Sequence, residues 1–255
     1  MSDLHPALPV PANGHRGLLL IGAREPVPGQ CKTRLGACIG MERAAALYRA
    51  FLVDIAMRFT TDPSWPAWEF DIAWAYTPAA ADFAAVLRDA GCPAPVAPVG
   101  FVPQEGEGWG ERQANLLRRG AELGYARTVL IASDAPQISV PLVQRAFTGL
   151  LDADLAVARS LDGGYSLIGL RGYHDVLSGV PMSTSDAGQA LIASGVALGL
   201  RVVETPPVFD VDDAADLDVL TAALAPDGAA APATWRALGE MGLLPVLTPG
   251  LPAVA

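Results

Sequence analysis

Three cations close together in an acidic chain are the first residues whose types and spacing could do chemistry. Arg24, Lys32 and Arg34 lie in the segment from Arg24 to Leu35, whose prolines and glycine predict a loop. Residues 17–23 before it form a short continuous apolar run, typical of a strand buried on both faces. Open α/β sheets bind ligands where such strands end, so cations in this loop could hold a diphosphate or a triphosphate.

This loop differs from the common nucleotide-binding motifs. In a Walker A loop glycine directly precedes lysine, whereas here Gln30 and Cys31 separate Gly29 from Lys32 and Thr33. No Gly-x-Gly-x-x-Gly follows the first strand, which excludes a Rossmann fingerprint. The alternative to a phosphate site is a solvated surface loop with ordinary charges.

Carboxylates at the ends of two later strands could supply a metal site. Asp134 follows an expected strand over residues 127–132, and Asp210 and Asp212 follow another at residues 201–205. A divalent ion that bridges phosphates prefers hard carboxylate oxygens, so Mg²⁺ or Mn²⁺ is the expected cofactor, with Asp134 and one of Asp210 or Asp212 as ligands. Asp134 could instead only form a turn.

Small polar residues further along the chain suggest where an acceptor binds. Asp162, Gly163, Gly164 and Tyr165 predict a hairpin turn, although paired glycines also let the backbone approach a sugar or another acceptor closely. The run from Ser183 to Ser185 is more typical of a helix cap than of a nucleophile. A histidine-based site is improbable, because the three histidines lie in the N-terminal tail or in a loop.

The elements that must position these residues alternate along the chain. Apolar runs predict strands at 17–23, 70–76, 93–99, 127–132, 154–159, 165–170 and 201–205. Helical periodicity predicts helices at 41–59, 80–90, 111–123, 139–151 and 184–198, and one ending at residue 224. Residues 61–66 are expected to form a loop, and the glycine-rich residues 101–110 a flexible lid. This order favours an α/β fold: a Rossmann-like mixed, mostly parallel sheet with helices on both faces and an antiparallel pair near Gly163.

Composition limits the class of protein. The chain has 255 residues, 51% of them hydrophobic, and a formal net charge of -10, which disfavours nucleic acid as a partner. We expect a loose tail over residues 1–16, one domain over 17–224, and a linker with a helical extension over 225–255. The three cysteines form no Cys-x-x-Cys pair, and we see neither a leader nor a membrane span, so a cytoplasmic protein is expected. The sequence does not fix the oligomeric state, and a homodimer is compatible with it.

The motifs, taken in order, resemble one bacterial family. They are Ala-Arg-Glu-Pro-Val-Pro-Gly-Gln-Cys-Lys-Thr-Arg-Leu, Gly-Trp-Gly-Glu-Arg, Ser-Asp-Ala-Pro, Asp-Gly-Gly-Tyr-Ser-Leu-Ile-Gly, Met-Ser-Thr and Asp-Val-Asp-Asp. Together they resemble the radical-SAM/selenodomain-associated transferase 1 family, often labelled GT-A glycosyltransferases. The chain is more distantly similar to phospholactate guanylyltransferase and to the molybdenum-cofactor guanylyltransferase. It departs from the family pattern at Met182, where tryptophan is usual, and at Gln30 and Cys31.

The resemblance implies a nucleotide-diphospho-sugar transferase fold and a role for each motif. Nucleotide-binding residues would be Ala23, Arg24, Gly29, Lys32, Arg34 and Ser133. Acceptor-binding residues would be Arg112, Asp162, Gly163, Gly164, Tyr165, Ser183 and Thr184. Lys32, Arg34 and Asp134 would be catalytic, and Asp134, Asp210 and Asp212 would hold the metal.

Two reactions fit these expectations. One is nucleotidyl transfer from a nucleoside triphosphate to a small phosphorylated acceptor, with release of pyrophosphate; the other is glycosyl transfer from a nucleotide sugar. The three cations favour the first, because departing pyrophosphate gains negative charge. A binding protein that senses a nucleotide without turnover is the alternative from another functional class.

Overall fold

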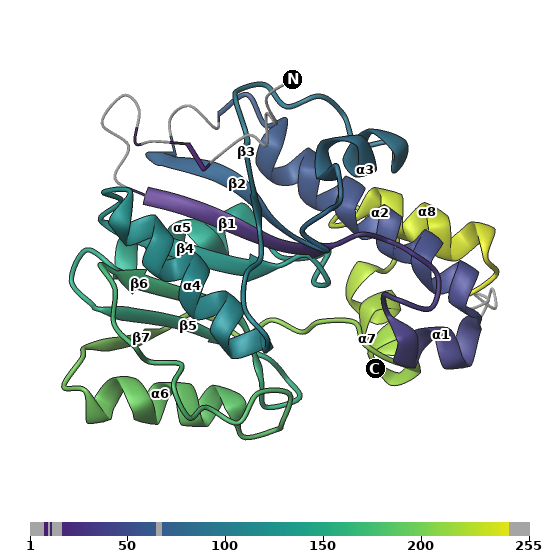
Figure 1. Ribbon diagram of the computed structural model, residues 1–255. Coiled ribbons are helices and arrows are strands. Elements are labelled where there is room, and N and C mark those ends of the chain that lie inside the picture. Colours follow the sequence, from purple (N-terminus) through teal and green to yellow (C-terminus); the bar gives the residue numbers. More distant parts are fainter. Residues whose placement is uncertain (1–7, 10, 12–16, 65–67, 245–255) are drawn as a thin grey trace, which may run out of the picture.

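A single mixed sheet organises the chain in the computed structural model, which describes residues 8, 9, 11, 17–64 and 68–244 (Figure 1). The strands are β1 (Gly17–Arg24), β2 (Phe70–Thr77), β3 (Gly100–Pro103), β4 (Arg127–Ala132), β5 (Leu155–Arg159), β6 (Tyr165–Arg171) and β7 (Val202–Glu204). The helices are α1 (Thr33–Ile39), α2 (Met41–Thr60), α3 (Phe83–Asp89), α4 (Trp109–Glu122), α5 (Val140–Gly149), α6 (Ala187–Ala197), α7 (Ala214–Leu224) and α8 (Pro232–Glu240).

The sheet has seven strands in the order β3-β2-β1-β4-β6-β5-β7. All neighbouring strands pair in parallel except β6, which runs antiparallel to both β4 and β5. The expected mostly parallel sheet and the antiparallel pair near Gly163 are therefore confirmed. The direction of β6 brings Tyr165, at its start, to the edge of the sheet where β4 ends.

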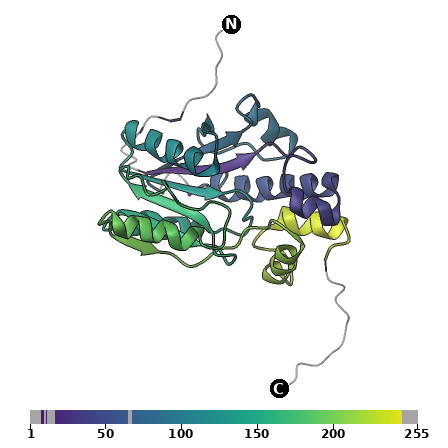
Figure 2. The ribbon, with the colours of Figure 1, turned by 60° about the horizontal axis from the view of Figure 1, so that its bottom comes forward.

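Helices cover both faces of the sheet, as expected, because the central strands are apolar on both sides. Leu19 and Ile21 of β1 belong to a core that includes α2 and α5. Leu18 and Leu20 face the other way, into a core that includes α4 and α6. Figure 2 shows α6 along the face opposite to α2. Burial of both faces holds β1 rigidly, so its carboxyl end is a rigid support for the loop that follows.

Three sequence-based expectations are wrong in detail. Residues 93–99 form no strand, because prolines at 93, 95 and 98 remove backbone donors, and the pairing with β2 begins only at Gly100. The expected lid over residues 101–110 starts as β3 and ends in the first turn of α4. The segment from Arg24 to Leu35 is not all loop, since α1 begins at Thr33. In the expected 61–66 loop, residues 65 and 66 lie outside the described part of the chain.

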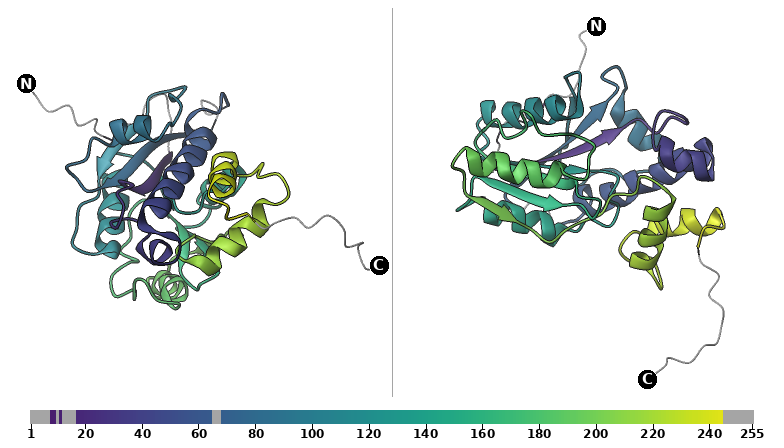
Figure 3. Two further views of the ribbon diagram at one scale, coloured as in Figure 1. Left: turned by 90° about the vertical axis from the view of Figure 1, so that its right-hand side faces the viewer. Right: turned by 90° about the horizontal axis from the view of Figure 1, so that it is seen from below.

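The C-terminal helices pack at the end of the molecule that carries α1 and α2 (Figure 3). The buried carboxylate of Asp54, on α2, accepts hydrogen bonds from the backbone N–H groups of Ala233 and Thr234 at 2.9 and 2.8 Å and from the Thr234 hydroxyl at 2.6 Å. These donors lie at the positive end of α8, where a carboxylate is favourable. Among the described helices, none combines the length and apolarity that crossing a membrane requires.

Candidate functional site

The cation-bearing turn after β1 aims Lys32 inward and leaves Arg34 near the surface. Lys32 precedes α1 with φ 46° and ψ 44°, a left-handed conformation that is uncommon for a residue with a side chain. Its side chain is only 7% exposed, whereas that of Arg34, on α1, is 69% exposed. Arg24 Nη1 donates to the carbonyl of Gln30 at 2.9 Å across the turn. The three cations therefore occupy different depths of one site.

The Lys32 ammonium is bound by two carboxylates from distant parts of the chain. Its Nζ lies 2.9 Å from Asp134 Oδ2 and 2.8 Å from Asp212 Oδ1. Burial lowers the pKa of Lys32, but the two carboxylates outweigh this effect and raise the pKa above its ordinary value. Arg34 Nη2 pairs with the other carboxylate oxygen of Asp212. Lys32 is therefore fully charged at neutral pH.

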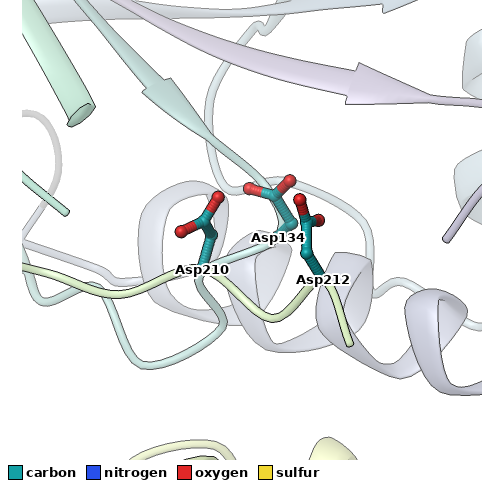
Figure 4. Close-up of side chains that lie close together, drawn as sticks. All are labelled: Asp134, Asp210 and Asp212. Carbon is teal, nitrogen blue, oxygen red and sulfur yellow. The ribbon is translucent and has the colours of Figure 1, made fainter. Parts of the chain in front are cut away.

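Three aspartates converge at this site (Figure 4). Asp134 is the second residue after β4, and one oxygen from each of Asp134, Asp210 and Asp212 lies within 4.8 Å of the others. The segment at residues 208–213 is fixed beside Asp134 because Val211 N donates to the carbonyl of Asp134 at 3.0 Å. Ser160 Oγ lies 2.7 Å from Asp210 Oδ1 and anchors that carboxylate. These three residues could hold a divalent cation.

The charge states of the two later aspartates differ. Burial, together with the nearby charge of Asp134, raises the pKa of Asp210 to about 6. Burial also tends to raise the pKa of Asp212, but Lys32 and Arg34 bring it below its ordinary value. Asp212 is thus neutralised by protein cations, whereas Asp210 lacks such a partner among the described residues.

Tyr48, a residue that the sequence did not single out, joins the first loop to β4. Its hydroxyl accepts a hydrogen bond from Arg24 N at 3.0 Å and lies 2.7 Å from Ser133 Oγ. Its ring also lies beneath the Lys32 ammonium, 5.9 Å from centroid to Nζ. The tyrosine is buried, which raises its pKa to about 12, so it acts as a neutral support.

Two cavities meet at the carboxylates. The first, of about 270 Å³, is lined by Arg24, Gln30, Cys31, Lys32, Thr33, Arg34, Tyr48, Asp134 and Asp212. The second, of about 630 Å³, is lined by Arg34, Trp109, Ala132, Asp134, Ser160, Asp162, Gly164, Tyr165, Met182, Ser183, Thr184, Ser185, Ala187, Asp210 and Asp212. Arg34, Asp134 and Asp212 line both. We call the first the cationic cavity and the second the hydroxyl cavity.

The backbone of the β5–β6 hairpin shapes one wall of the hydroxyl cavity. Gly163 has φ 92°, and its carbonyl accepts a hydrogen bond from Gly188 N at 3.0 Å. A side chain at Gly163 would collide with the backbone of Ser185. The glycine therefore lets the hairpin pack directly on residues 183–188, where Ser183 itself has φ 62°.

Most of the sequence-predicted site residues come together in these cavities. The exceptions are Ala23, Gly29, Ser133, Arg112 and Gly163, which do not line them. Ser133 supports Tyr48, and Arg112 Nε donates to the carbonyl of Gly106 at 3.0 Å, which shapes the turn before α4. Gly29 provides a positive φ of 75° in the exposed turn.

The sequence reasoning assigned no role to Tyr48, Trp109 or Ser160. Tyr48 has helical core spacing and could not be distinguished from packing residues. Trp109 stands between two glycines, an unusual setting for a large aromatic residue that could have served as a signal.

Comparisons with known proteins identify one family profile and several solved structures that are similar to this chain. The profile of DUF2064, described as an uncharacterized protein conserved in bacteria, matches residues 67–184. A crystal structure from Desulfovibrio desulfuricans G20, provisionally assigned as a nucleotide-diphospho-sugar transferase, is 29% identical with a TM-score of 0.75. The match covers 89% of this chain and 96% of that one. No protein of curated function matches the chain.

Other solved structures are less similar to this chain in sequence and in fold. A CMP:2-keto-3-deoxy-manno-octonic acid synthetase complexed with CTP is 14% identical with a TM-score of 0.45, covering 82% of this chain and 98% of the other. A 4-diphosphocytidyl-2C-methyl-D-erythritol synthase from Anaerococcus prevotii DSM 20548 is 10% identical with a TM-score of 0.47, covering 81% and 96%. Similarity at this level carries no functional argument. The strand order and the Desulfovibrio structure confirm the expected nucleotide-diphospho-sugar transferase fold, and with the DUF2064 match they support that superfamily.

Proposed function

We propose that this chain is a metal-dependent transferase that uses a nucleotide as its donor substrate. The observation that carries the proposal is the position of the three aspartates between a cavity lined by three cations and a cavity lined by hydroxyl and aromatic groups. Donor phosphates suit the first cavity and an acceptor the second, so a group would be transferred between them. The 29% identical Desulfovibrio protein supports this assignment. Within the superfamily we propose the radical-SAM/selenodomain-associated transferase 1 family, with residues 17–224 as the catalytic domain.

The aspartates fit a divalent metal. Asp134 Oδ1 is a buried carboxylate oxygen without a hydrogen-bond partner among the described residues, and Asp210 lacks a cationic partner there. Hard carboxylate oxygens of this kind suit Mg²⁺ or Mn²⁺. Asp134 and Asp210 would be the first ligands, because both oxygens of Asp212 already accept from Lys32 and Arg34. When bound, the ion would neutralise charge on the donor phosphates.

Nucleotidyl transfer is the reaction that we favour. An acceptor oxygen would attack the α-phosphorus of a nucleoside triphosphate, and the bond to the bridging oxygen would break to release pyrophosphate. Arg24, Lys32 and Arg34 would hold the charge that develops on this leaving group, since all three line the cationic cavity. Ala23, Gly29 and Ser133 would shape the backbone of the same half of the site.

Glycosyl transfer is the second candidate, and the hydroxyl cavity favours it. At about 630 Å³ it has room for a sugar, with Trp109 and Tyr165 as apolar surfaces and Ser183 and Thr184 as hydrogen-bonding groups. In this reaction an acceptor hydroxyl oxygen would bond to the anomeric carbon of the sugar, its proton passing to water or to a carboxylate of the cavity. The bond between that carbon and the diphosphate would break, and a nucleoside diphosphate would leave through the cationic cavity.

The charge of the hydroxyl cavity bears on the acceptor in either reaction. Its lining has four carboxylates, those of Asp134, Asp162, Asp210 and Asp212, against one guanidinium, that of Arg34. Lys32 also pairs with Asp134 and Asp212, so a bound divalent ion would bring these charges only to balance and leave no net positive charge to attract an anionic acceptor. An uncharged, hydroxylated acceptor therefore fits better than the phosphorylated one expected from the sequence.

Product analysis tests these alternatives. The full chain is incubated with Mg²⁺ or Mn²⁺, a panel of nucleoside triphosphates and nucleotide sugars, and uncharged polyol or sugar acceptors. Release of pyrophosphate supports nucleotidyl transfer, and release of a nucleoside diphosphate supports glycosyl transfer. Tight nucleotide binding without any product would instead support a sensor that binds nucleotide without turnover.

A further inference from the structure

The position of the Lys32 ammonium conflicts with its expected role on the donor phosphates. In the structure Nζ contacts the carboxylates, at 2.9 Å from Asp134 Oδ2 and 2.8 Å from Asp212 Oδ1. The side chain is almost fully buried, so this cation is shielded from water by its two partners. Lys32 thus occupies the side of the aspartate cluster that faces the cationic cavity.

A divalent ion that used all three aspartates would need oxygens that Lys32 already holds. Mg²⁺ binds carboxylate oxygens at about 2.1 Å. An ammonium group on the same oxygens would then stand within about 5 Å of the ion, where two positive charges repel each other strongly in a partly buried site. Asp134 Oδ1 and Asp210 have no cationic partner among the described residues, whereas Asp134 Oδ2 and both oxygens of Asp212 are already paired with Lys32 or Arg34.

We infer that Lys32 is a built-in competitor of the divalent cation, which keeps the three-aspartate site closed until donor phosphate draws the ammonium away. The alternative partner is at hand, because Lys32 lines the cationic cavity in which the proposed function places the phosphates. Metal and nucleotide therefore bind cooperatively, and each increases the affinity of the other by the same factor. This inference rests on the proposed function and adds a control on metal entry to it.

Removing the competing charge tests the inference without any nucleotide. Mn²⁺ alone is titrated into the metal-free full chain, and free Mn²⁺ is measured by electron paramagnetic resonance. Lys32→Met, which retains length but not charge, should bind Mn²⁺ about tenfold more tightly than the wild type, or more, given the strength of charge interactions at such distances. Mn²⁺ should also raise the melting temperature of Lys32→Met more than that of the wild type.

Arg24→Met is the matched control. It removes one positive charge from the same turn and the same cavity, but the described contact of its guanidinium is the Gln30 carbonyl rather than a carboxylate. Its Mn²⁺ affinity should therefore change less than threefold or so, since an exposed charge is screened by water and salt. An equal gain in both variants would show a general charge effect and would overturn the specific role of Lys32.

Other outcomes separate this inference from the proposed function. If Lys32→Met binds Mn²⁺ with unchanged or lower affinity while Asp134→Asn removes binding, the metal site stands and the competition is refuted. If Asp134→Asn leaves Mn²⁺ binding unchanged, the metal site of the proposed function fails as well. Should Lys32→Met not fold, Lys32→Arg keeps the charge and should bind Mn²⁺ no more tightly than the wild type, and tighter binding would refute the inference.

Discussion

Replacing Asp210 by asparagine should stabilise the metal-free protein at neutral pH. Its pKa is raised from an ordinary value of 3.8 to about 6, mainly by burial. Because the folded pKa exceeds the unfolded one, the folded state binds the proton more tightly, and stability is lost as pH rises from about 4 through about 6. At about 1.4 kcal/mol per pKa unit the penalty at neutral pH is at most about 3 kcal/mol. Relaxation and solvent reduce it, so we expect a gain of about 2 kcal/mol for Asp210→Asn.

Urea denaturation in the presence of a chelator measures this gain. The difference between Asp210→Asn and the wild type should be largest near pH 7.5 and approach zero below about pH 3, where the aspartate is protonated in both states. Asparagine keeps an oxygen for the Ser160 hydroxyl, so the hydrogen bond at 2.7 Å need not be lost. Asp89→Asn, at an exposed position on α3, is the control for the loss of one carboxylate and should change the stability little. A less stable Asp210→Asn, or a difference independent of pH, would refute the reasoning.

Three further variants test how the site is supported. Asp54→Ala leaves three donors at the start of α8 without their carboxylate and should lower the free energy of unfolding by about 3 kcal/mol or more in urea denaturation. A decrease below about 1 kcal/mol would contradict the role of Asp54 in holding α8 against α2. Gly163→Ala forces a side chain into the backbone of Ser185 at φ 92° and should cost at least about 3 kcal/mol or prevent folding, as followed by thermal denaturation; a variant of normal stability would disprove the close approach. Tyr48→Phe removes the hydroxyl shared by Arg24 and Ser133 and should cost about 1 to 2 kcal/mol and weaken nucleotide binding in calorimetry; unaltered stability and binding would exclude that bridge.

The sequence predicted the sheet, and it placed most of the candidate site residues at one edge of it, for one physical reason. Strands buried on both faces are continuous apolar runs, and polar residues directly after them must lie at one edge of a parallel sheet. Asp134 and the residues after Arg24 were found in this way. Asp210 does not directly follow β7, and its place beside Asp134 depends on the hydrogen bond from Val211 N, which only the folded chain shows.

Pairing between distant charges could not be predicted. Lys32 lies 102 residues from Asp134 and 180 from Asp212, and no local pattern joins them. The short helix α1 was also missed, because among its seven residues only Leu35 and Gly36 are buried and its apolar period is weak. Residues 93–99 were predicted to be a weak edge strand. The prolines in this segment lack backbone N–H donors, so the segment forms no regular strand pairing.

Calorimetric titration of nucleotide into the full chain, with and without Mg²⁺ or Mn²⁺, tests the central claim most directly. If the aspartates hold a metal that bridges to donor phosphates, at least one nucleoside triphosphate or nucleotide sugar should bind tightly only with the metal, and Asp134→Asn should abolish the metal effect. Nucleotide binding that is equally strong in a chelator, or a metal effect that survives in Asp134→Asn, would contradict a metal-dependent site at the end of β4.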